Sequence, residues 1–477
     1  MLKRIIYRWV GVACLSLAVW ACKTPDLIQK TESKVVPASY NSSQDTTNTG
    51  KIRWQDYFTD PYLISLIDTA LQNNQELNIV LQEIQIARNE VQARKGEYLP
   101  FVGYGAGAGV DKPGRYTSKG SSEATTEIKP GMETPDPLPD FMAGLYASWE
   151  VDIWHKLRNA KKSAFNRYLG TVEGKNFLVT NLIAEIANSY YELLALDNQL
   201  RIVQQNIEIQ SNALQIVRLQ KQSARVTELA VRRFEAQVLN TRSLQFGIQQ
   251  QIIETENKLN FLVGRFPQPI QRNSQNFIDL VPNVLNAGVP AQLLENRPDV
   301  RQAELDLVAA KLDVQVAKAR FYPSLGLSAG LGFQAFNPID LVKMPESLIY
   351  GLAADLAGPL INKNAIKAAY SSANAMQIQA VYNYERTILT AYIEVANQLS
   401  NIGNLANTFE LKSLQVDALT ESVDISSNLF RSARADYMEV LLTQRDALES
   451  RFELIDTKMA QMHAVVNVYQ ALGGGWR

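Results

Sequence analysis

The chain has 477 residues, and its 47 Lys and Arg are balanced by 48 Asp and Glu, which leaves a formal net charge of −1 at pH 7. No basic excess is available for phosphate contacts, so the composition argues against a nucleic-acid partner. His155 and His463 lie far apart, and no Cys or carboxylate cluster accompanies them, which argues against a metal site. The length allows about two to four ordinary domains or one large elongated domain.

Residues 1–21 predict an export signal that is removed from the mature chain. A positively charged start precedes the apolar run 10–20, which is too short to cross a bilayer as a helix. The run ends in Ala21 and Cys22, an arrangement that resembles a bacterial lipobox. We therefore expect Cys22 to be the first mature residue and to carry covalent lipid, with no other cofactor. The alternative is an ordinary signal peptide with an incidental Cys.

The mature chain divides into an arm, two repeats and a linker. Residues 22–60 begin with a stretch rich in Ser, Thr, Asn, Lys and Pro, which buries little and predicts a lipidated extended arm. The first repeat covers residues 61–264 and the second covers residues 296–477. Between them, residues 265–295 contain four prolines and predict a linker at the equator of the molecule.

The duplication is clearest where a helical pattern changes into a strand pattern. In each copy a helical run meets a triplet that contains an aromatic residue and ends in Pro100 or Pro323. Proline cannot continue a helix, and the spacing then changes to strict alternation. Four strands are predicted, at residues 101–110, 141–153, 324–333 and 347–356.

Each predicted strand has one apolar face and one face of small or polar residues. The alternative is a small soluble sheet, but no additional hydrophobic segment is available to cover it. Alternation of this kind suits a membrane barrel with lipid outside and a pore inside. Four strands cannot close a barrel, because closure needs about eight, and open edges are not tolerated in lipid. We therefore expect three chains to contribute twelve strands.

The face that we expect to line the pore is small and partly acidic. Its predicted residues are Gly103, Gly105, Gly107, Glu150, Asp152, Gly326 and Gly330. Two roles stay open for Glu150 and Asp152: they bias the pore toward cations, or they hydrogen-bond to the helix start at His155 and Lys156.

Long helices account for most of the remaining sequence. Residues 156–222 contain no proline and would extend about 100 Å as one helix. Apolar residues in this helix recur at steps of four and three, which is typical of a coiled-coil seam. The chain reverses near residues 223–227 and returns to Val263. The second copy repeats this with a helix over 364–430, a reversal near 432–436 and a return to Ala471.

Several short motifs, taken together, resemble the TolC-like outer membrane factors, in the lipoprotein branch that includes OprM and NodT. The residues that carry the resemblance are Asp60-Pro61 with Leu63, Asn73-Asn74 with Leu77, Trp149-Glu150-Val151-Asp152, Pro290 with Leu293-Leu294-Glu295, Arg297-Pro298-Asp299-Val300-Arg301, Phe321-Tyr322-Pro323, and Ala471-Leu472-Gly473-Gly474-Gly475-Trp476. The resemblance covers nearly the whole mature chain. It implies a homotrimer with a twelve-stranded β-barrel over a long α-helical barrel in the periplasm.

The resemblance also implies a function and partners. The chain would be the outer membrane exit duct of a tripartite efflux system, anchored by lipid and passively conducting cargo. A periplasmic adaptor protein and an inner-membrane pump would be its partners, and it would be no enzyme. The alternatives are a type I protein secretion duct and a structural envelope lipoprotein that conducts nothing. Drug, metal and protein cargo stay open.

In the family the helix reversals form the periplasmic tip, where the aperture closes and the adaptor docks. Carried over to this chain, that role falls on Arg225, Thr227, Arg434, Asp436 and Glu439. These side chains are either solvated turn charges or inter-chain ion pairs across the closed aperture. Family reversals carry Gly where this chain has an Ala in each copy. Because Ala resists a positive φ, we expect a turn of different shape.

Overall fold

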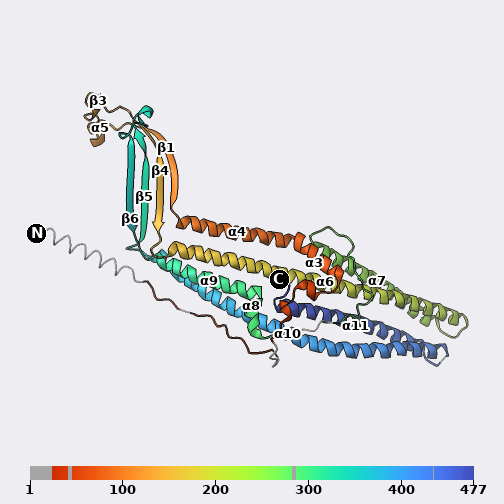
Figure 1. The fold of residues 1–477 in the computed structure, drawn as a ribbon. Helices are drawn as coiled ribbons and strands as arrows, with labels where there is room; N and C mark the ends of the chain where they lie inside the picture. The colour runs from red at the N-terminus through yellow and green to blue at the C-terminus, as the bar shows by residue number, and fades with distance from the viewer. Residues whose placement is uncertain (1–23, 29, 41–45, 282–285, 433, 477) are drawn as a thin grey trace. The chain divides into compact units, whose positions relative to one another are not determined.

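The structure is a computed structural model that describes residues 24–476, except for 29, 41–45, 282–285 and 433. The described chain forms two compact units. Unit 1 contains the residues up to Thr31 together with Gln85–Leu169 and Leu305–Val381, and unit 2 contains Glu32–Ile84, Gly170–Glu304 and the residues from Tyr382. Each unit draws on both sequence repeats, so the compact units cut across the repeats (Figure 1).

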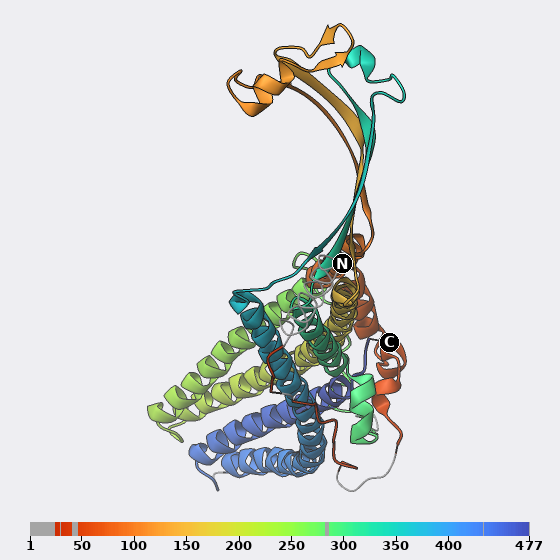
Figure 2. The same cartoon turned by 90° about the vertical axis from the view of Figure 1, so that its left-hand side faces the viewer.

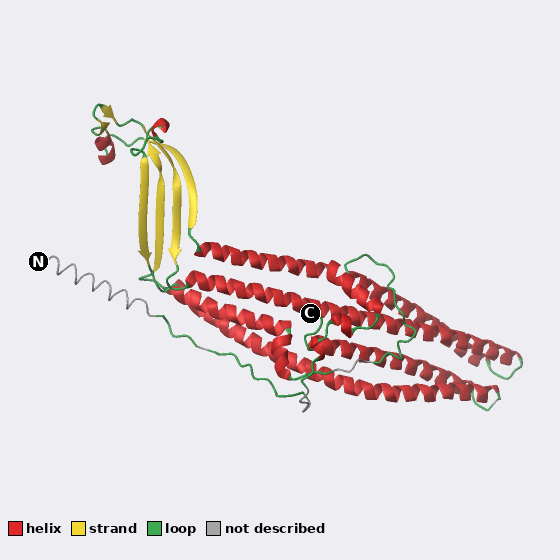
Figure 3. Cartoon of the chain, viewed as in Figure 1, coloured by secondary structure: helices red, strands yellow, loops and turns green. Residues whose placement is uncertain are grey.

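Unit 1 contains a four-stranded antiparallel sheet in the order β1-β4-β5-β6 (Figure 3). The strands are β1 (Phe101–Asp111), β4 (Leu138–Val151), β5 (Ser324–Ala335) and β6 (Leu348–Ala357). All four predicted strands are present, and their predicted bounds are correct to within three residues. The main difference is β4, which begins three residues earlier than expected and ends before Asp152.

The register places the small residues of all four strands on one face. Gly103 pairs with Tyr146, Tyr146 pairs with Gly330, and Gly330 pairs with Gly351. Because directly paired residues point to the same side of a sheet, this row shares one face. The alternation seen separately in each strand therefore combines into one continuous surface.

The connections far from the helices contain more structure than expected. The segment between β1 and β4 contains a short helix, α5 (Ser118–Glu123), and a two-stranded ribbon of β2 (Glu127–Lys129) and β3 (Met132–Glu133). The connection between β5 and β6 contains a 3-10 turn, η3 (Pro338–Asp340). The sequence analysis predicted no helix or strand between the strands at 101–110 and 141–153.

Four helices are shared between the units, α5 and η3 belong to unit 1, and the other described helices belong to unit 2. The shared helices are α4 (Gln75–Tyr98), α6 (Lys156–Gln222), α9 (Pro298–Ala319) and α10 (Asn364–Arg431). The others are η1 (Thr49–Lys51), α2 (Trp54–Tyr57), α3 (Pro61–Asn73), α7 (Glu228–Leu262), η2 (Pro290–Gln292), α8 (Leu293–Asn296) and α11 (Tyr437–Ala471). None of the helices in the described part of the chain combines the length and the apolar character needed to cross a membrane.

The hydrophobic core of unit 2 lies where α3, α6, α11 and the linker meet. The predicted seam of α6 is buried, with Ile186, Tyr190 and Leu193 each fully inaccessible. The Tyr190 hydroxyl donates a hydrogen bond of 2.8 Å to Asp60, whose other carboxylate oxygen caps α3 by accepting from Tyr62 N. The seam thus connects the long helix to the start of a short one.

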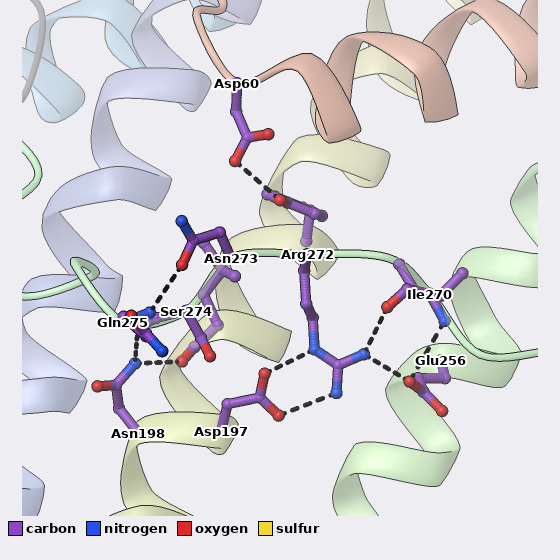
Figure 4. Close-up of polar contacts among 11 residues, drawn as sticks. Asp60, Asp197, Asn198, Glu256, Ile270, Arg272, Asn273, Ser274 and Gln275 are labelled. Atoms are coloured by element: carbon purple, nitrogen blue, oxygen red, sulfur yellow. Dashed lines mark hydrogen bonds and ion pairs between the residues drawn. The ribbon is translucent and has the colours of Figure 1, made fainter.

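The linker is fixed to the helices by Arg272 (Figure 4). Its guanidinium makes a bidentate contact with Asp197 on α6, at 2.6 and 2.9 Å, and donates to Glu256 on α7 at 2.5 Å. Burial of the guanidinium opposes its charge, but the hydrogen bonds from Asp197 and Glu256 outweigh this effect and raise the pKa of Arg272. A proline-rich segment without long helices therefore has a defined path.

The two copies end their return helices in the same way. Gly264 after α7 has a φ of 76°, and Gly473 after α11 has a φ of 80°. A Cβ at Gly264 would lie 2.4 Å from Asn73 O, and one at Gly473 would lie 2.6 Å from Asn296 O. Only glycine fits such a backbone and such a close approach, so the two copies share this feature in structure as well as in sequence.

Residues 24–40 of the arm, apart from residue 29, contain no helix or strand, whereas the short helices η1 and α2 lie near the end of the arm. In unit 1, Asn374 donates to the Ile28 carbonyl at 3.0 Å and Gln377 donates to the Lys30 carbonyl at 3.2 Å. In unit 2, the rings of Tyr40 and Tyr392 stack with centroids 5.3 Å apart. The described start of the arm therefore follows α10 in the direction of the helix.

Candidate pore surface and helical tips

One face of the sheet is formed by small residues, and we call it the small face. Its members are Phe101, Gly103, Gly105, Gly107, Gly109, Asp140, Met142, Gly144, Tyr146, Ser148, Glu150, Ser324, Gly326, Ser328, Gly330, Gly332, Gln334, Ile349, Gly351, Ala353, Asp355 and Ala357. The five glycines predicted to line a pore, at positions 103, 105, 107, 326 and 330, all lie on it.

Crowding where β4 and β5 pair indicates that the small face is the concave face of the sheet. A Cβ added at Gly144 would lie 2.8 Å from Leu331 O, and one at Gly332 would lie 2.6 Å from Ala143 O. Backbone crowding on one side means that neighbouring strands bend toward that side, and only glycine permits such an approach. Figure 2 shows the strands curving along their length. A barrel built by extending this curvature would therefore have the small face inside.

The opposite face is apolar and exposed. Its largest side chains include Tyr104, Tyr350 and Leu352, which are 86%, 82% and 84% exposed. An exposed apolar surface of this kind marks contact with lipid or with another protein. The two outer strands, β1 and β6, each pair on one side only within the described chain. Unpaired strand edges next to an apolar face require a further partner.

Glu150 lies on the small face as predicted, but it is paired. Its carboxylate forms an ion pair with Lys156 at the start of α6, with the Lys156 Nζ 2.5 Å from the Glu150 Oε1. The positive side chain offsets the charge through which Glu150 would attract cations. Of the two roles left open for Glu150, this ion pair corresponds to contact with the helix start at Lys156.

The prediction that Asp152 lines the strand face is wrong. Asp152 follows β4 and is only 5% exposed. Its carboxylate accepts hydrogen bonds from Leu157 N at 3.0 Å and Arg158 N at 2.9 Å, in the first turn of α6. Of the two roles left open, hydrogen bonding to the helix start therefore holds for Asp152, because the free N–H groups there attract a carboxylate.

The helix reversals lie where the sequence placed them, at residues 223–227 and 432–436. In the first turn Ala224 has a φ of 54°. Arg225 N donates to Gln220 O and Ala224 N donates to Lys221 O, both at 2.9 Å, which is the Schellman pattern of helix ends. The expectation of a differently shaped turn is therefore wrong for this copy, because Ala224 takes the conformation that glycine would take. The counterpart, Ala433, lies outside the described residues.

The five predicted tip residues are all exposed. Thr227 and Asp436 stand at the N-caps of α7 and α11 without a side-chain hydrogen bond to the helix. Within the described chain, no ion pair involves Arg225, Arg434, Asp436 or Glu439, since the charged contacts near the first turn join other residues. Both interpretations of these charges, solvation and pairing with another chain, require this exposure.

A separate apolar cluster holds the two tips together within unit 2. Val217 and Phe234 from the first hairpin and Val440 from the second are at most 3% exposed in this cluster. Arg233 also donates to the Met438 sulfur at 3.3 Å. The two turns are therefore packed as one end of the helical region, which the sequence did not predict.

Cys22, the expected lipid attachment site, lies outside the described residues. Among the residues that the structure describes there is no group of three or more His, Cys, Asp and Glu side chains that could hold a metal ion.

The comparison with known families identifies the class of protein. The profile of the family described as outer membrane efflux protein matches residues 66–265 and 289–474. These ranges include both helical hairpins and all four strands of the sheet. The chain therefore belongs to this family of efflux proteins, and it is an outer membrane protein.

Two relatives and one solved structure span most of the chain. The pyoverdine export outer membrane protein OpmQ of Pseudomonas aeruginosa is 29% identical over 425 residues, which cover 89% of this chain and 88% of that protein. The cation efflux system protein CusC of Escherichia coli is 26% identical over 470 residues, which cover 97% and 98%. A crystal structure of CusC matches with a TM-score of 0.81 at 25% identity, covering 95% of this chain and 99% of that one.

Proposed function

We propose that three copies of this chain form one exit duct through the outer membrane. Each copy would contribute β1, β4, β5 and β6 to a twelve-stranded barrel, and the long helices would form a tunnel on the periplasmic side. The duct would conduct cargo passively and would work with a periplasmic adaptor protein and an inner-membrane pump. Lipid on Cys22 would anchor each copy in the same membrane.

The observation that carries this proposal is the sheet of unit 1. It has a concave face of small residues, an exposed apolar face, and unpaired backbone along both β1 and β6. In lipid, unpaired backbone groups cost several kcal/mol each, of order 2–7 kcal/mol by transfer measurements. Pairing β1 of one copy with β6 of the next removes both edges and places the small face around a pore.

We propose further that the duct opens at the helical tips. Arg434 and Asp436 of one copy would pair with charges of a neighbouring copy when the tip is closed. These charges are exposed and lack ion pairs within the described chain, so they are available for such contacts. Reversing both charges should raise the closed-state conductance in planar bilayers, and an unchanged conductance would count against this role.

The cargo is the least constrained part of the proposal. The relatives reported above are named for pyoverdine and for cations, and these cargoes have little chemistry in common. A duct whose wall is largely glycine, serine and alanine offers few groups for selecting one of them. We therefore propose a general conduit whose cargo is selected upstream by the pump and the adaptor.

The experiment that tests the duct combines a gel with a conductance measurement. Purified mature protein should migrate as a trimer on SDS gels without boiling and as a monomer after boiling. The same preparation should insert into planar bilayers and give discrete current steps. A monomer under all mild conditions, together with absence of current, would support a spacer that does not conduct.

A further inference from the structure

The small face contains a groove of 380 Å³ that crosses all four strands. Its floor consists of glycines and of the backbone between them, and its walls are three larger side chains. The floor glycines are Gly105, Gly144, Gly330, Gly332 and Gly351, and the walls are Met142, Tyr146 and Ile349. Because paired glycines have no side chains, a row of them in the middle of a concave face leaves a groove between the larger neighbours.

The groove has no charged lining residue, although charged groups lie on the same face at both of its ends. Toward the helices the next charged residues are Glu150 and Asp355, and toward the far loops Asp140 accepts hydrogen bonds from Gln334. A charged group placed in the groove would lose water without gaining a partner. The charge pattern therefore favours an uncharged occupant between two polar ends.

One aromatic ring of the chain already occupies the same kind of surface. The Tyr146 ring lies over Gly103, so that a Cβ at this glycine would be 2.5 Å from Tyr146 Cζ. The Phe101 ring is also near the Tyr146 ring, with centroids 6.0 Å apart. A glycine backbone on this face thus already packs against one aromatic ring, that of Tyr146. The glycines of the groove floor present the same kind of backbone surface, and no side chain of the described residues covers it.

We propose that this groove is a binding site inside the pore for a neutral aromatic ring of the cargo. The ring would lie on the backbone around Gly330 and Gly351, with its edge against the Tyr146 ring and its ends against Met142 and Ile349. Contacts between aromatic rings and with methionine sulfur favour such an occupant over an aliphatic chain of equal volume. The role of this site rests on the proposed function: in a trimeric duct, each of the three copies would contribute one such site to the wall of the channel.

The structure provides a substitution that fills the groove and a matched control. Nothing lies within 4 Å of a Cβ at Gly351, so Gly351→Val fills the floor without a clash. Gly109 on β1 faces the same side and is equally open, but it lies outside the groove, which makes Gly109→Val the control. A third variant, Tyr146→Leu, removes the aromatic wall.

The experiment measures binding of 1-naphthol, a neutral aromatic probe, to the purified protein in detergent by fluorescence. Partitioning into the micelle is common to all variants, so the difference between variants is the signal. We expect Gly351→Val and Tyr146→Leu to weaken binding about fivefold or more, while Gly109→Val matches the wild type. Naphthalene-1-sulfonate, which carries a charge, should bind weakly to all of them.

A second measurement separates this site from the duct. In planar bilayers, 1-naphthol should shorten open periods of the wild-type and Gly109→Val channels and affect Gly351→Val much less. Equal fluorescence binding by wild type and Gly351→Val overturns the groove, whether or not the protein conducts. Selective binding without any channel current supports the groove and contradicts the duct.

Discussion

The sheet of unit 1 and the equatorial core of unit 2 are stabilised in different ways. In the core, residues such as Ile67 and Leu193 are fully buried by neighbours from the same chain, and Arg272 is enclosed by two carboxylates. In the sheet, large apolar residues such as Leu352 are mostly exposed, and regular backbone pairing is the main internal contact.

This difference indicates which part of the molecule is complete in one chain. The core buries its own apolar surface, so its stability should respond to single side chains. The sheet leaves an apolar face and two edges without partners in the described chain, so its stability should depend on lipid and on neighbouring copies. The predictions below test the two regions against each other.

Removing the linker arginine should have the largest effect. Arg272→Ala leaves Asp197 and Glu256 unpaired beneath the linker, and loss of one partner of a buried ion pair costs about 3–5 kcal/mol. Unfolding of the helical region in urea, followed by circular dichroism, measures this loss. As a control, Arg232→Ala removes exposed contacts with Glu228 and Glu235 and should change little. Equal effects of the two variants would refute the distinction between buried and surface pairs.

Adding a side chain at the bent centre of the sheet should come next. Gly332→Val places atoms against the backbone of Ala143 and Gly144, and overpacking of this kind costs about 1–3 kcal/mol. Gly107→Val meets nothing within 4 Å and serves as the control on the same face. We expect the first variant to lower the yield of heat-sensitive trimer while the helical region keeps its urea midpoint. If both variants assemble equally well, the small face is not the crowded, concave one.

Relaxing the first helix reversal should stabilise it. Ala224 has a positive φ that costs a non-glycine residue about 1 kcal/mol, and Ala224→Gly removes this cost. By contrast, Ala236→Gly at an exposed position of α7 should destabilise by about 1 kcal/mol, because glycine weakens a helix interior. Hydrogen exchange of the amides around residues 219–228 reports the first change, and exchange of the amides around residue 236 reports the second. Faster exchange in Ala224→Gly would contradict the strained turn.

The smallest expected effect is a pH dependence within the core. Burial lowers the pKa of His463 below its usual 6.5, although its hydrogen bond with the Asn188 carbonyl at 2.9 Å acts in the opposite direction. The unfolded chain therefore takes up a proton more readily, and stability present above pH 6.5 falls as the pH is lowered. His463→Gln should flatten this part of the profile between pH 7 and 5. If the variant instead lost stability more steeply with falling pH, His463 would not be the group responsible for the acid destabilisation.

The elements of the fold were predictable because each has one dominant period. Alternation fixed the four strands, and the absence of proline from 156 to 222 fixed α6. The predicted contacts were less reliable where they depend on three-dimensional neighbours. The alternating spacing predicted Asp152 as a strand residue. Its carboxylate instead accepts hydrogen bonds from free N–H groups in the first turn of α6, a contact that the alternation does not reveal.

The candidate pore surface was predictable in composition but not in detail. Glycine at every second position showed which face is small, whereas the crowding of Gly144 against Gly332 depends on the register between β4 and β5. The conformation of Ala224 was unpredictable for another reason. Two backbone hydrogen bonds close the helix end over residues 220–225, and together they outweigh the preference of Ala224 for a negative φ.

The central claim is that β1 of one copy pairs with β6 of another. A photoreactive p-benzoylphenylalanine in place of Val102, on the outer strand β1, tests this most directly in membranes. After irradiation we expect covalent dimers and trimers that survive boiling, with the attached peptide mapped to residues 348–357. Attachment only to helices of the same chain, with no higher species on the gel, would contradict the shared barrel.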